Sequence, residues 1–131
     1  ECDFDPLGVG SHVGSHRMAW ELNRIFGWKL AFDREIDSKI KNIETRHIVL
    51  RHSDEEEGLD IALILNRVPE GVLASGASSL DYLLRLGHGV MTSENVINRI
   101  RNSNLVTLVT FLNPEKSGAL EAMFELDIYK E

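Results

Sequence analysis

The sequence has little of what marks several large classes of protein. It contains a single cysteine, Cys2, among 131 residues, so no disulfide can form within the chain. Its longest uninterrupted apolar run, Ile61 to Leu65, is far shorter than the roughly 20 residues that span a bilayer. The start of the chain lacks the basic and apolar segments of a signal peptide. These absences lead us to expect a cytoplasmic protein that has no membrane partner.

Positive charge is also scarce. The chain has 14 Lys and Arg residues against 21 Asp and Glu residues, which gives a net charge of −7. This excess of negative charge repels the phosphate backbone of nucleic acids, so we expect no nucleic-acid partner. The densest acidic run, Asp54 to Glu57, precedes Gly58 and lies between two apolar segments. The pattern predicts a solvated hairpin tip, with a cation site at this tip as the alternative.

The residues that are present suit one domain with a single core, because 43% of the chain is apolar and the apolar residues are spread along its length. Period-two patterns predict strands within residues 7–13, 30–32, 47–52, 59–66, 80–86 and 105–112. Helical spacing predicts a helix at 18–26 that ends at Gly27 and has Glu21 and Arg24 on the side away from its apolar stripe. A second helix is expected at 92–101, capped by Thr92 or Ser93, and a third from 114 onward, after the helix start Asn113-Pro114. The polar stretch at 34–45 has no clear periodicity and receives no assignment.

These elements predict an α+β fold. We expect a two-layer sandwich in which two or three helices cover one face of a mainly antiparallel sheet. One arrangement of this kind is a ferredoxin-like plait, and the strand, helix and strand expected at 80–112 would form half of it.

The order of several motifs resembles the IPExxxVDY proteins, a small bacterial family without an established activity. The segment from Asp3 to Asn23 is similar to the start of that family, Asp54 to Gly58 to its acidic turn, and Phe111 to Lys116 to its last strand and helix start. The family signature is only half present. Ala74-Ser75-Gly76 stands where the family has Ile-Pro-Glu, and Leu80-Asp81-Tyr82 stands where it has Val-Asp-Tyr. The resemblance implies a fold and a cytoplasmic location, and it implies no reaction or cofactor.

Two histidines are the candidates for a metal site. His12 and His16 are four residues apart, so their imidazoles would share one face of a helix that began by residue 11. Asp3, Asp5 or Glu21 could supply a third ligand. This pattern supports one hypothesis of function, a small metal-dependent or acid-base enzyme.

The other hypothesis is a non-enzymatic interaction or regulatory domain that binds a protein partner or a second copy of itself. An edge strand and four residues carry it: Trp20 and Trp28, which bracket the first expected helix, and the pair Asp81 and Tyr82 on an otherwise apolar strand. We favour this hypothesis, and with it we expect no catalytic residues and no cofactor.

Overall fold

The structure is a computed structural model that describes residues 3–87 and 91–127. Cys2 lies outside the described residues. The helices are α1 (Ser15–Phe26), α2 (Ser93–Arg101), α3 (Pro114–Ser117) and α4 (Leu120–Glu125), with a 3₁₀ turn, η1 (Ser75–Ala77). The strands are β1 (Phe4–Gly10), β2 (Ala31–Ile40), β3 (Ile43–Asp54), β4 (Leu59–Leu65), β5 (Arg67–Val68), β6 (Gly71–Val72), β7 (Tyr82–Gly87) and β8 (Leu108–Phe111). None of the described helices is long and apolar enough to cross a membrane.

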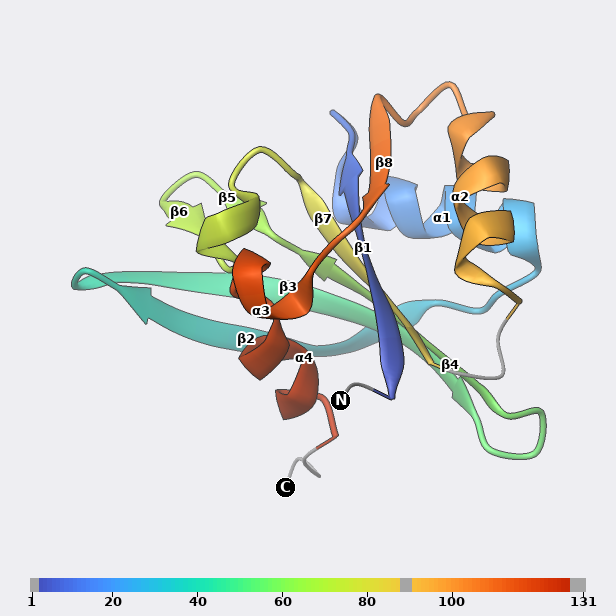
Figure 1. The fold of residues 1–131 in the computed structure, drawn as a ribbon, viewed down its shortest axis with the longest axis horizontal. Helices are drawn as coiled ribbons and strands as arrows, with labels where there is room; N and C mark the ends of the chain where they lie inside the picture. Colours follow the sequence, from blue (N-terminus) through green and yellow to red (C-terminus); the bar gives the residue numbers. More distant parts are fainter. Residues whose placement is uncertain (1–2, 88–90, 128–131) are drawn as a thin grey trace.

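Six of these strands form one antiparallel sheet in the order β2-β3-β4-β7-β1-β8, while β5 and β6 form a separate small hairpin. The α+β class and the antiparallel sheet are therefore confirmed. The units β1-α1-β4 and β7-α2-β8 interleave their strands, as in a ferredoxin-like plait. The hairpin of β2 and β3 is inserted into the first unit and extends the sheet as a long arm (Figure 1).

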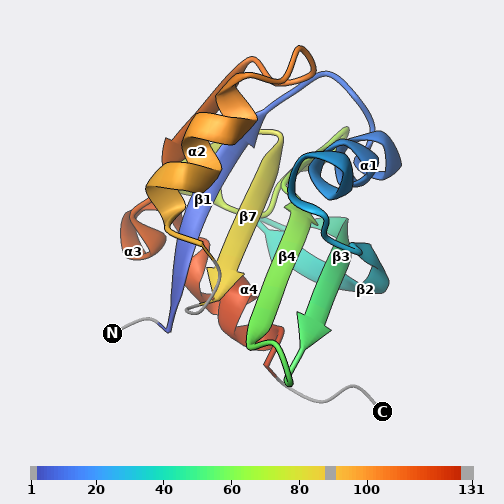
Figure 2. The same cartoon turned by 90° about the vertical axis from the view of Figure 1, so that its right-hand side faces the viewer.

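Two helices cover one face of this sheet, as expected, and the opposite face carries a second cover that the sequence did not indicate. Helices α1 and α2 cover one face, and α3 and α4 lie on the opposite face (Figure 2). The cause is the central strand β4, where Ile61 and Leu63 contribute to one core while Ala62 and Ile64 contribute to the other. A strand that is apolar on both faces needs a cover on both faces, and η1 and α4 supply the second one.

Several local predictions are confirmed. Gly27 ends α1 in a left-handed conformation, and its N–H bonds to the carbonyl of Asn23. Thr92 caps α2 by accepting a bond from the N–H of Asn95. Asn113 caps α3, whose first residue is the predicted proline.

The stretch at 34–45 is the main element that the sequence did not assign. It forms most of β2 and the start of β3, joined by a two-residue turn at Lys41 and Asn42. Both turn residues have positive φ, 52° and 67°, as a type I′ turn requires. The turn lacks the glycine that usually signals this geometry, and the strands are mostly exposed, so neither of the usual sequence patterns is present.

Candidate functional site

Asp81 and Tyr82 lie where three strand ends meet. One carboxylate oxygen of Asp81 accepts the N–H of Ser11 at 2.8 Å, and the other lies 3.8 Å from Arg67 Nε. The hydroxyl of Tyr82 donates to the carbonyl of Val13 at 2.6 Å. Burial raises the pKa of this hydroxyl to about 12, and the carboxylate of Asp81 adds to the rise. Both side chains hold the loop between β1 and α1, and Tyr82 stays protonated at neutral pH.

His12 and His16 are both exposed, but α1 begins only at Ser15, so His16 lies in its first turn and His12 in the loop before it. The two imidazoles therefore do not share a helix face. A cavity of about 480 Å³ is lined by His12, Ser11, Arg67 and the Asp81–Tyr82 pair, whereas His16 is not among its lining residues. Among the described residues, no group of three or more His, Cys, Asp and Glu side chains could hold a metal ion. The structure therefore gives the predicted histidine site no third ligand within residues 3–87 and 91–127.

Glu21, one of the expected third ligands, is instead buried on the inner side of α1. Its carboxylate pairs with Arg24 at 2.9 Å and accepts the hydroxyl of Ser103 at 2.5 Å. These two hydrogen bonds, that from Arg24 first, lower the pKa of the Glu21 carboxyl. The prediction that Glu21 lies on the exposed side of the helix is wrong, because the charge is neutralised locally and buried with its partners.

The two tryptophans differ in location. Trp28 is only 6% exposed and stacks on Phe26 with ring centroids 4.2 Å apart. Trp20 is 57% exposed, with the guanidinium of Arg17 5.6 Å above its ring. With Tyr82 also buried, at 1% exposure, Trp28 and Tyr82 present no surface for a partner. Of the three aromatic positions predicted to make a contact, only Trp20 is accessible.

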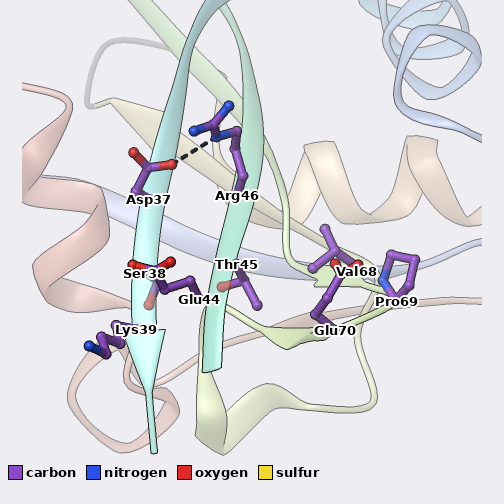
Figure 3. Close-up of a pocket in the computed structure, with 9 residues that line it drawn as sticks. All are labelled: Asp37, Ser38, Lys39, Glu44, Thr45, Arg46, Val68, Pro69 and Glu70. Atoms are coloured by element: carbon purple, nitrogen blue, oxygen red, sulfur yellow. Dashed lines mark hydrogen bonds and ion pairs between the residues drawn. The ribbon is translucent and has the colours of Figure 1, made fainter. Parts of the chain in front are cut away.

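The hollow beside the β2–β3 arm, about 610 Å³, lies between this arm and the β5–β6 turn (Figure 3). Asp37 and Arg46 face each other across the two strands, 3.0 Å apart, and both are well exposed. Nine residues line the hollow: Asp37, Ser38, Lys39, Glu44, Thr45, Arg46, Val68, Pro69 and Glu70. The set contains charges of both signs and neither a histidine nor a cysteine.

Two arginines on the opposite face of the sheet, the buried Arg85 and the partly buried Arg51, hold the C-terminal helix. Arg85 on β7 bonds to Asp127 at 2.8 Å and lies over the ring of Phe4. Arg51 on β3 pairs with Asp60 at 2.9 Å and donates to the carbonyl that follows α4. The sequence does carry a signal for this network, because Arg85 lies within an otherwise apolar strand, but the sequence analysis did not single it out. Both cations are bonded to carboxylates of the same protein, which indicates a structural role.

His47 is a second buried polar residue that the sequence did not single out. Its ring lies between the carbonyl of Leu65, 2.8 Å from Nδ1, and the hydroxyl of Thr45, 2.7 Å from Nε2. Burial lowers the pKa of this imidazole, so the neutral form is favoured. The ring is fully buried and both of its nitrogens are hydrogen-bonded within the protein, so it has no access to a substrate.

The two edges of the large sheet remain as candidate contact surfaces. In β8, the N–H of Leu112 bonds to the carbonyl of Pro6, and the register pairs Thr110 with Gly8. Because hydrogen-bonded positions alternate along an antiparallel pair, the backbone groups of Val109 and Phe111 point outward. Within the described residues, no strand pairs with these outward groups.

The outer edge of β2 is different in chemistry. Its turn is closed by Ile40 and Ile43, so the backbone groups that point outward belong to Glu35, Asp37 and Lys39. A bulge also interrupts the pairing of β2 between Phe32 and Arg34. Charged residues and bulges are the features with which proteins block unwanted strand pairing.

Edge β8 has none of these protections. No charged residue occurs from Asn102 to Asn113, and the pairing of β8 with β1 is unbroken. Leu108 is 50% exposed on one face of the strand, and Phe111 is 53% exposed on the other. The sequence predicted a strand here, but it gave no sign that the strand would lie at an edge. Comparison with known protein families, with curated proteins and with solved structures gives no match to this chain.

Proposed function

We propose that this protein is a non-enzymatic interaction domain that binds an extended protein segment along β8. The observation that carries the proposal is the pair of outward-facing peptide groups at Val109 and Phe111, in a strand without charge or bulge. Such an edge is a template for an added strand, whose backbone supplies the affinity. The side chains of such an added strand would also contact Leu108 and Phe111, which are exposed on opposite faces of β8.

The titratable groups support the same proposal. An active site needs acids and bases whose pKa values are tuned and whose side chains converge. Among the described residues, the groups with shifted pKa values other than arginines are Glu21, His47, Asp54 and Tyr82. They lie at four separate places, and each is hydrogen-bonded to a neighbour. Their shifts follow from packing, which favours an interaction domain over an acid-base enzyme.

We also propose, from the sequence resemblance, that the chain is related to the IPExxxVDY proteins. Leu80-Asp81-Tyr82, the half of the signature that is present, leads into β7 and fixes the β1–α1 loop. A structural role for this pair agrees with a family for which no reaction is established.

A peptide selection on the immobilised full chain tests the proposal. We expect the selected peptides to be uncharged, rich in β-branched and aromatic residues, and able to protect the amides of Val109 and Phe111 from hydrogen exchange. Phe111→Pro removes one outward N–H and leaves the bonds to β1 in place, because proline is tolerated on the outer side of an edge strand. This variant should lose peptide binding.

The matched control is Phe32→Lys, at a side chain 60% exposed on the opposite edge of the sheet. This variant should bind the selected peptides as the wild type does. Peptides that bind Phe111→Pro and the wild type equally well would refute the proposed site.

A further inference from the structure

We infer that the segment which occupies β8 is the β8 strand of a second copy of this chain, paired antiparallel about a two-fold axis at Thr110. The inference rests on the proposed function of this edge and names its partner. It follows from three observations: the positions of the outward backbone groups, the side-chain order of the strand, and the charge at the two ends of the sheet.

The backbone of β8 can pair with itself without leaving an outward group unused. With Thr110 opposite the partner's Thr110, Val109 faces the partner's Phe111 and Phe111 faces the partner's Val109. These are the residues whose N–H and C=O groups point outward. Each facing pair exchanges two N–H···O bonds, as hydrogen-bonded positions do in an antiparallel ladder. The Thr110 hydroxyl, 3.3 Å from the Phe111 carbonyl, leaves that carbonyl a second lone pair.

The side chains of the same register are complementary. Residues 108–112 are Leu-Val-Thr-Phe-Leu, so the two-fold axis places leucine opposite leucine and threonine opposite threonine. The remaining positions pair phenylalanine with valine. Threonine pairs and pairs of an aromatic with a β-branched residue are both favourable across antiparallel strands. The strand is thus nearly its own complement, as a two-fold interface requires.

Charge also favours a second copy at this edge. Each chain has a net charge of −7, so two copies repel each other over most of their surfaces. The run without charge from Asn102 to Asn113 lets the two chains approach at β8 without placing like charges in contact. Once β8 is paired, the free edges of the joined sheet are two copies of β2, which carry the bulge and the charged outward positions. The assembly therefore stops at two chains.

The first test is the mass of the full chain in solution as a function of concentration, measured by sedimentation equilibrium. We expect the weight-average mass to rise from 14.8 kDa towards twice that value. Thr110→Lys places two ammonium groups at the two-fold axis, and Phe111→Pro removes an outward donor. Both should weaken the dimer at least tenfold, while Phe32→Lys should not change it. Thermal unfolding of each variant establishes that it is folded.

The second test measures the register by disulfide cross-linking in a Cys2→Ser background. A pair that faces itself outside the hydrogen-bonded positions has Cα atoms about 4.5 Å apart, which suits a disulfide. Thr110→Cys should therefore cross-link rapidly on mild oxidation. Leu108→Cys is the matched control, because four residues of strand, roughly 13 Å, would separate it from its own counterpart.

Three outcomes would overturn the inference. They are a wild type that stays monomeric at every concentration, a dimer unaffected by Thr110→Lys and Phe111→Pro, and a Thr110→Cys variant that cross-links no faster than Leu108→Cys. A monomer whose β8 still binds the selected peptides would overturn the inference while leaving the proposed function in place. A chain that is monomeric at every concentration and also binds none of the selected peptides along β8 would refute the proposed function as well.

Discussion

The two edges of the same sheet have opposite chemistry. Strand β2 has ten residues, of which Asp33, Arg34, Glu35, Asp37 and Lys39 are charged, and it contains a bulge. Strand β8 has four residues, none charged, and its pairing with β1 is regular. An edge without these features is a template for pairing with another strand, so its presence on one side alone supports the proposal that this side makes the contact. The comparison suggests a division within one sheet: one edge is blocked against strand pairing, and the other edge is left open to it.

The edges also differ in how they are anchored. β2 has a single buried side chain, Ile36, whereas residues 61–64 of the central strand β4 are all buried and alternate between the two cores. β8 is anchored by Val109 under α2 and is continued by Leu112, which packs against the opposite core. The long arm of β2 and β3 is thus held at its base and solvated along most of its length (Figure 1).

The largest change in assembly size is expected when the charged residues at the outer edge of β2 are replaced by uncharged ones, as in β8. Replacing Glu35, Asp37 and Lys39 together by threonine removes the charges whose backbone groups point outward. We expect assemblies larger than two chains, because both edges of each sheet could then pair. Light scattering over a concentration series measures this. The control replaces Glu55 and Glu56 by threonine, since both are exposed in the β3–β4 turn and lie outside the strands. An unchanged mass distribution in the triple variant would show that charge does not protect β2.

The next effect concerns the anchor of β2. Ile36→Ala should lower the free energy of unfolding by about 2–4 kcal/mol, because a fully buried isoleucine is replaced by a cavity. Ile40→Ala, at a side chain 36% exposed near the tip of the arm, should cost less than about 1 kcal/mol. Urea denaturation followed by circular dichroism gives both values. Equal costs at the two positions would contradict the view that only the base of the arm is held.

A smaller effect is expected from pH, through His47, which is paired in register with Ile36. Burial lowers the pKa of this histidine in the folded protein, so the folded state binds fewer protons than the unfolded state below pH about 6.5. Its contribution to stability is present at neutral pH and is lost as the pH falls below that value. One proton limits the slope to about 1.4 kcal/mol per pH unit.

The measurement is the free energy of unfolding between pH 7.5 and 5, compared between wild type and two variants. His47→Gln should flatten the dependence on pH even though it lowers stability at every pH. His16→Gln, at an exposed histidine, should keep the wild-type slope. A slope that is the same in all three proteins would exclude His47 as its source.

Much of the local structure was predictable because it depends on near neighbours in the chain. The spacing of Met18, Ala19 and Leu22 gave the buried stripe of α1, and Gly27 gave its end. The hairpin of β3 and β4 followed from two apolar runs around a turn that ends in a glycine. The β2–β3 hairpin was missed because β2 is mostly exposed and the turn has no glycine.

The candidate site was less predictable. Asp81 and Tyr82 stood out as a polar pair on an apolar strand, and the fold uses them to hold the β1–α1 loop. Trp28 could be placed in a core only once its stacking partner Phe26 was known to lie beside it. The buried pairs of Glu21 and Arg85 have partners 82 and 42 residues away, a distance over which sequence spacing gives no signal.

The sequence by itself determined the elements, their capping residues, the acidic character of the chain and the uncharged run from Asn102 to Asn113. Only the tertiary structure decided that this run would form an edge. Strand order is set by pairing between distant segments, and β8 lies outermost because β1 pairs with it on one side and with β7 on the other. The same residues in a central strand would have no outward peptide groups. The physical reason is that side-chain pattern is local, whereas a free hydrogen-bonding edge is a property of the whole sheet.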